Sequence, residues 1–191
     1  MKYLIVLLTL ATLTSCSTAL HQTVAPAYSN SVVVNDIQQT VLLGYCAPQM
    51  LEIDPFKSWY IPNYNNYQVD SSELAAISKA FKKKRIEIFA GTWCGGSKSD
   101  LPKMLKILKA ANVDSSQIQL IFLNNTAAQY KQSPGHEEAG KNIVRTPTYI
   151  IYQGSKEMGR VIDSPIESFE KDLLKILRSE PYQPHFYDLK L

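Results

Sequence analysis

The sequence predicts an α/β fold in which helices flank a central mixed sheet and an N-terminal extension precedes it. From residue 70 onward, strand-like apolar runs alternate with amphipathic helical segments, an order that requires parallel strands. A strand–turn–strand pattern over 148–162 adds antiparallel pairing. The 191 residues are 45% hydrophobic and 19% charged, which suits one domain with its own core.

The region before residue 70 is less regular. Valine- and leucine-rich runs at 31–34 and 40–43 predict two short strands. Residues 44–69 are irregular and rich in aromatic side chains. We therefore expect 31–69 to form an extension packed on the domain; the alternative is that its rings form a ligand surface.

The elements after residue 70 follow from periodicity and capping signals. Asp70, with Glu73 three residues later, predicts a capping box at the start of a helix. Ser164, Pro165 and Glu167 predict the start of the last helix in the same way. We expect that helix to bury Ile166, Phe169, Leu173 and Ile176. Between these helices we expect strands at 85–90, 118–123, 148–152 and 156–162, and a helix following residue 94.

Residues 1–15 have the features of an export signal. Lys2 precedes a short apolar run that is too short for a permanent membrane span. The run ends in Leu-Thr-Ser-Cys16, which resembles a bacterial lipobox. The resemblance implies cleavage before Cys16 and lipidation of its thiol. The alternative is an ordinary secretory signal that is cut a few residues later.

This resemblance implies a location and a domain order. The protein would be lipid-anchored in the bacterial cell envelope, and by analogy the Ser17 that follows the cysteine implies the outer membrane, facing the periplasm. The predicted order is a signal peptide at 1–15, a tether at 16–30, the extension at 31–69, the main domain at 70–180 and a tail at 181–191.

Composition argues against several classes of partner. The net charge is +3, without the clustered basic excess of a nucleic-acid-binding protein, so we expect no nucleic-acid partner. The histidines at 21, 136 and 185 lack metal-ligand spacing, and Gly-rich phosphate loops are absent. We therefore expect neither a metal nor a cofactor.

Cys46 and Cys94 remain once Cys16 is assigned to the signal. Cys94 lies in Trp93-Cys-Gly-Gly-Ser97, between a predicted strand and a predicted helix. Pro102 follows eight residues later, within that helix. The pair Thr146-Pro147 immediately precedes another predicted strand.

These residues resemble the thioredoxin family over about residues 70–178, and specifically bacterial envelope thioredoxin-like proteins with a C-x-x-S site. The resemblance implies a thioredoxin-like fold and a cis Thr146–Pro147 bond. It also implies that Trp93, Thr146 and Pro147 bind the substrate beside Cys94. Three features depart from the family pattern: Ser97 replaces the resolving cysteine, Ile88 replaces a buried aspartate, and the loop before Pro147 is long.

The site residues predict a restricted chemistry. A helix N-terminus favours the thiolate form of Cys94, and the Ser97 hydroxyl could donate a hydrogen bond to its sulfur. Cys94 could then form a mixed disulfide, which Ser97 cannot resolve. We therefore expect thiol–disulfide exchange with exported protein thiols or disulfides, or with small thiols. The alternative is a redox-inert peptide-binding module.

Cys46 has three interpretations. It is a buried and inert side chain, a structural disulfide partner of Cys94, or a resolving thiol for the mixed disulfide. The sequence leaves all three open.

Overall fold

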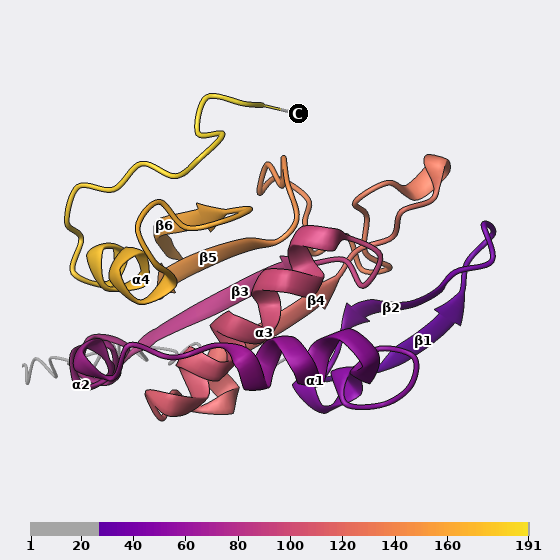
Figure 1. The fold of residues 1–191 in the computed structure, drawn as a ribbon. Helices are drawn as coiled ribbons and strands as arrows, with labels where there is room; N and C mark the ends of the chain where they lie inside the picture. The colour runs from indigo at the N-terminus through magenta and orange to yellow at the C-terminus, as the bar shows by residue number, and fades with distance from the viewer. Residues whose placement is uncertain (1–26, 191) are drawn as a thin grey trace, which may run out of the picture.

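A computed structural model describes residues 27–190 of the chain (Figure 1). The predicted signal peptide and Cys16 lie outside the described residues. A six-stranded sheet has the order β1-β2-β4-β3-β5-β6. Its strands are β1 (Ser31–Val34), β2 (Thr40–Tyr45), β3 (Lys84–Ala90), β4 (Ile118–Phe122), β5 (Thr148–Gln153) and β6 (Lys156–Ile162).

The sheet is mixed, as expected. β3 pairs in parallel with β4, while β1–β2, β2–β4, β3–β5 and β5–β6 are antiparallel. β3 lies between β4 and β5, and its last five residues are all buried. Such a strand is apolar because both of its faces are covered.

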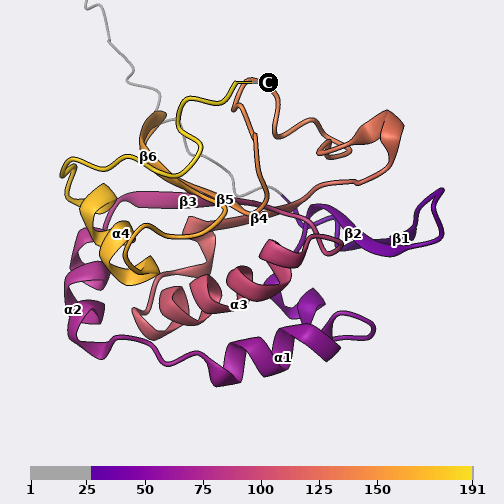
Figure 2. The same cartoon turned by 45° about the horizontal axis from the view of Figure 1, so that its top comes forward.

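Four helices cover one face of the sheet (Figure 2). They are α1 (Lys57–Asn66), α2 (Ser71–Ala80), α3 (Gly95–Ala110) and α4 (Phe169–Leu177). Short 3-10 turns lie at Pro48–Leu51, Ser115–Gln117 and Ala127–Gln129. The opposite face is covered by the long connection over 124–147 and by the C-terminal tail. The helices and the sheet confirm the α/β class.

The two faces of the sheet bury different amounts of apolar surface. The helical side holds the larger core, which includes Ile88, Leu101 and Leu108. The other side holds a smaller cluster built around Phe89, Ile121, Leu123, Ile143, Ile150 and Tyr152. α3 is therefore fixed on the sheet mainly by the larger core.

The extension is part of this fold. β2 adds to the sheet through its pairing with β4, and Phe56 and Tyr60 are buried in the larger core. These two rings pack inward and do not form a ligand surface. The sequence reading missed α1, because its residues KSWYIPNYNN include Pro62 and mix polar and aromatic side chains without an apolar stripe.

The start of α2 differs from the predicted capping box. The Asp70 side chain accepts a hydrogen bond from the Ser72 backbone N–H (3.0 Å), as an N-cap should. The Asp70 backbone N–H, however, donates to Glu170 Oε1 of α4 (3.1 Å), in place of the expected Glu73. The reciprocal cap therefore comes from a residue one hundred positions away in sequence.

The last helix begins later than predicted. Ser168, not Ser164, is the N-cap of α4, and its hydroxyl accepts from the Lys171 N–H (3.2 Å). The buried Asp172 carboxylate accepts from the backbone N–H groups of Ile166 and Glu167 and so holds that stretch outside the helix. Ile166 is consequently exposed, while Phe169, Leu173 and Ile176 are buried as expected.

The Glu170 contact yields a stability prediction. Glu170→Ala leaves the Tyr67 hydroxyl and the Asp70 N–H without their acceptor, so we expect a loss of about 1–3 kcal/mol in the free energy of unfolding. Urea denaturation measures this loss. Glu167→Ala is the control, because its ion pair with Lys175 is exposed and should contribute less than about 1 kcal/mol. Equal losses in both variants would contradict the assignment.

Candidate functional site around Cys94

Cys94 lies at the junction of β3 and α3. It is the N-cap residue of α3, with an extended backbone, and its N–H donates to the Gly91 carbonyl (2.9 Å). The Cys94 carbonyl accepts from the Lys98 N–H (3.0 Å), the first hydrogen bond of the helix. The residue is half-buried, so reagents can reach the thiol at the N-terminal end of a sixteen-residue helix.

The Thr146–Pro147 pair meets Cys94 in space. The Cys94 Sγ donates to the Thr146 carbonyl over 3.1 Å, and the Thr146–Pro147 bond is cis, as predicted. The Pro147 carbonyl accepts from the Asp163 N–H (2.8 Å) and is thereby tied to the end of β6. Antiparallel pairing of β3 with β5 produces this meeting, because Phe89 near the end of β3 lies opposite Thr148 at the start of β5.

Gly96 permits the close approach of this loop to α3. A Cβ atom at position 96 would lie 3.1 Å from Asp163 Oδ1 and 3.4 Å from Pro147 Cδ. A Cβ atom there would require the Asp163 carboxylate to shift by a few tenths of an ångström and would be in close contact with Pro147. No motif or spacing in the sequence predicts Asp163 at this site.

The predicted role of Ser97 toward the sulfur is wrong. Ser97 is buried, and its hydroxyl accepts from the Gly91 N–H (3.1 Å) without a hydrogen bond to Cys94 Sγ. The serine points back at the turn after β3, so its observed contact stabilises that turn.

Trp93 and Tyr130 form an aromatic surface beside Cys94. The Trp93 indole N–H donates to the Leu123 carbonyl (2.7 Å), and its ring stacks on Tyr130 with centroids 5.7 Å apart. Tyr130 is more than half exposed. Sequence reasoning missed Tyr130 and the adjacent Lys131, because a long irregular loop carries no periodic signal.

Cys46 does not pair with Cys94. Both thiols are free, so the structural-disulfide interpretation is wrong. Cys46 is fully buried in the larger core, and burial raises the pKa of its thiol to about 11. Its backbone N–H donates to Leu120, so it lies beyond β4, two strands from β3 and about 10 Å away across the sheet.

Tyr149 places a buried hydroxyl beneath the site. It lies opposite Ile88 in the β3–β5 pairing, and its ring packs edge-on against Phe169. Its hydroxyl is buried without a hydrogen-bond partner among the residues described. Burial, together with the nearby Asp100 and Asp163 carboxylates, raises the pKa of Tyr149 well above its ordinary value and keeps the phenol neutral.

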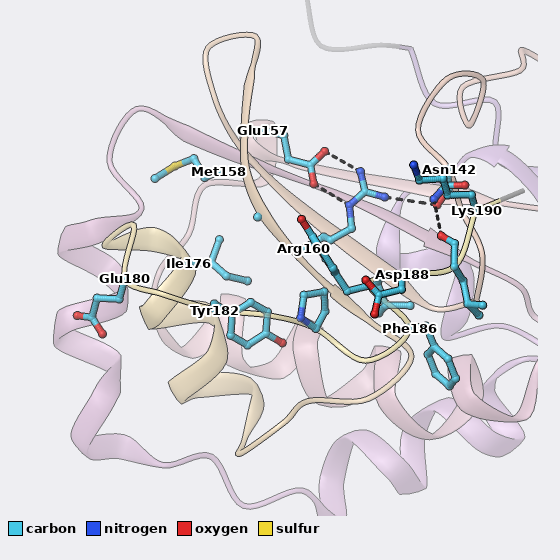
Figure 3. Close-up of a pocket in the computed structure, with 15 residues that line it drawn as sticks. Asn142, Glu157, Met158, Arg160, Ile176, Glu180, Tyr182, Phe186, Asp188 and Lys190 are labelled. Carbon is cyan, nitrogen blue, oxygen red and sulfur yellow. Dashed lines mark hydrogen bonds and ion pairs between the residues drawn. The ribbon is translucent and has the colours of Figure 1, made fainter.

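A cavity away from Cys94 lies along the domain's last strand (Figure 3). It measures about 730 Å³ and lies between β6, the end of α4 and the tail that contains Tyr182 and Phe186. Arg160 points into it, but its Nε and Nη2 groups donate to the Glu157 carboxylate at 2.6 Å and its Nη1 group donates to the Lys141 carbonyl. No cysteine, serine or histidine among the described residues lines this cavity, so we place the candidate chemistry at Cys94. No cluster of His, Cys, Asp and Glu in residues 27–190 is arranged to hold a metal ion.

Comparisons with known proteins do not assign a function to this chain. No protein-family model matches the chain, and no curated protein matches it. A similar solved structure is that of a protein of unknown function from Pseudomonas aeruginosa, with a TM-score of 0.48 and 10% identity. That match covers 66% of this chain and 86% of the other. In the part of the chain that the structure describes, no helix is both long and apolar enough to cross a membrane.

The two thiols should differ in reactivity. At pH 8, iodoacetamide should label the half-buried Cys94 of native protein within minutes and leave Cys46 unlabelled, since Cys46 is buried and its pKa is about 11. In denaturant, both should react at similar rates. Peptide mass mapping identifies each site. Rapid native labelling of Cys46 would show that its strand opens readily.

The unpartnered hydroxyl yields a second stability prediction. Tyr149→Phe removes the buried, unpartnered hydroxyl and keeps the aromatic ring. We therefore expect the free energy of unfolding to rise by about 1 kcal/mol. Tyr182→Phe is the matched control: that hydroxyl donates to Asp172 (2.9 Å), and its loss should destabilise the fold by about 1–3 kcal/mol. Destabilisation by Tyr149→Phe would show that its hydroxyl has a partner.

Proposed function

We propose that this protein is a single-cysteine thiol–disulfide exchange protein with a thioredoxin-like fold. The observation that carries the proposal is the half-buried Cys94 at the start of α3, whose sulfur lies 3.1 Å from the carbonyl that precedes cis-Pro147. A thiol in this position can reach a substrate disulfide.

The topology supports the thioredoxin-like part of the proposal. β3, α3 and β4 form a parallel unit, and β5, β6 and α4 follow as an antiparallel hairpin and helix. The strands β4-β3-β5-β6 are neighbours in that order, with α3 and α4 on the same face. The long 124–147 connection covers the other face, where the sheet presents its smaller apolar cluster.

The proposed exchange has two steps and no net transfer of electrons. The Cys94 thiolate attacks one sulfur of a substrate disulfide, forming a mixed disulfide and releasing the other sulfur as a thiolate. A thiolate from a second molecule then attacks the substrate sulfur in the mixed disulfide. This forms a new substrate disulfide and returns the electron pair to Cys94.

The second thiol must come from outside the fold. Ser97 bears no sulfur, and Cys46 is buried two strands away with a raised pKa. Exchange, rather than net reduction, is therefore the chemistry that these residues favour. The proposed substrates are exported protein thiols or disulfides, or small thiols, met in the bacterial envelope where the Cys16 lipobox would anchor the chain.

Trapping tests this function directly. Wild-type protein incubated with a small disulfide should accumulate a mixed disulfide at Cys94, located by mass mapping, and added thiol should release it. Cys94→Ser should trap nothing, while the control Cys46→Ala should trap as wild type does. Ser97→Cys should supply a resolving thiol and shorten the lifetime of the adduct by about tenfold or more. Absence of any Cys94 adduct would favour the redox-inert peptide-binding module.

A further inference from the structure

Two cationic residues of the 124–147 connection are direct neighbours in sequence of residues that contact Cys94 or Trp93. Arg145 immediately precedes Thr146, whose carbonyl accepts from the Cys94 sulfur. Lys131 follows Tyr130, whose ring stacks on Trp93. The Lys131 ammonium donates to the carbonyl of Val144, two residues before Thr146. Both cations are thus fixed to the short segment that contacts the thiol.

Each cation is held by contacts that leave its charge uncompensated. The Lys131 ammonium lies 5.2 Å from the Tyr130 ring centroid, and the Arg145 guanidinium lies 4.8 Å from that of Phe186. Phe186 belongs to the tail, which is also attached by the hydrogen bond from Asn142 to the Leu189 carbonyl (3.0 Å). In residues 27–190 neither Lys131 nor Arg145 forms an ion pair with a carboxylate.

This arrangement contrasts with the other cations near the same face of the sheet. Arg85 and Lys141 share the buried Glu87, at 3.1 and 2.7 Å. By comparison, burial and the nearby Arg145 charge lower the pKa of Lys131. Bringing two like charges together costs free energy, and no carboxylate among the described residues forms an ion pair with either cation to offset it. A bound anionic group would supply that offset.

The charges around Cys94 are also divided by side. Asp163 lies against Gly96, and Asp100 lies on the next turn of α3. Lys131 and Arg145 instead belong to the 124–147 connection. Asp100 is buried and ion-paired with Lys103 (2.6 Å), so the carboxylate on the side of α3 and β6 is that of Asp163, whereas the cations belong to the side of the Trp93–Tyr130 pair.

We propose that the preferred substrates of Cys94 are anionic disulfides, whose carboxylate is bound by Lys131 and Arg145 next to the Trp93–Tyr130 surface. This inference rests on the proposed exchange function and names its substrate class. The cations act in the mixed-disulfide step, in which the substrate sulfur bonds to Cys94 and the departing half leaves as a thiolate. In this step, a substrate carboxylate close to the reacting sulfur forms ion pairs with both cations.

Three small disulfides of similar size test the proposal on the full chain. They are 3,3′-dithiodipropionate with two negative charges, bis(2-hydroxyethyl) disulfide with none, and cystamine with two positive charges. The rate constant for the Cys94 adduct is measured for each by mass mapping. The ratio of the anionic to the cationic rate constant is the readout, since a change in thiol ionisation alone affects both rates equally.

We expect wild-type protein to react about tenfold faster with the anionic disulfide than with the cationic one, a preference that added salt weakens. Lys131→Met and Arg145→Met should each lower the ratio several-fold, and the double variant should bring it close to one. Lys131→Arg retains the positive charge and should retain the wild-type ratio. Lys109→Met is the control, because it removes an exposed charge about 20 Å along α3.

The outcomes separate the two hypotheses. If all three disulfides form a Cys94 adduct but the ratio is near one, or is unchanged in the double variant, the anionic-substrate inference is wrong and exchange stands. If none of them forms an adduct, the exchange function itself is wrong. Circular dichroism of each variant establishes that the fold is retained, and Lys131→Arg separates loss of charge from disruption of the loop.

Discussion

The register between β3 and β5 is the constraint on which the site depends. Phe89 lies opposite Thr148, so the turn after β3 and the turn before β5 meet at one edge of the sheet. Cys94 and Thr146 are therefore in contact although 52 positions separate them. A slip of one residue in this pairing would move side chains such as Ile88 and Tyr149 to the opposite face of the sheet. Such a slip is unfavourable because both faces of β3 bury apolar side chains that would lose their packing.

The rest of the fold holds this edge in place. α3 is fixed by the larger core, and the absence of a side chain at Gly96 lets the Pro147 loop lie against its first turn. On the other face, the described residues cover the smaller cluster with an irregular connection and the tail. This connection carries Tyr130, Lys131 and Arg145 to the site, so the same segment that completes the core also supplies the charge around Cys94.

Much of the fold follows from local patterns. The alternation of strands and helices after residue 70, the strands near 31–34 and 40–43, and the turn at Gly154 are found where the sequence predicts them. Three local predictions were incomplete or wrong, each for a different reason. Glu170 caps α2 in place of Glu73, Asp172 holds residues 166–167 out of α4, and α1 forms without an apolar stripe.

The sequence by itself determined the α/β class, the position of Cys94 between a strand and a helix, and the proximity of Thr146–Pro147 implied by the family resemblance. Only the tertiary structure decided that Ser97 bonds to Gly91 and that Cys46 is buried apart from Cys94. It alone brought Lys131 to the Val144 carbonyl, Arg145 to the Phe186 ring and Asp163 to Gly96. Helix and strand periodicity depends on neighbours along the chain, whereas these contacts depend on how two loops fold over one edge of the sheet, and no local spacing encodes that.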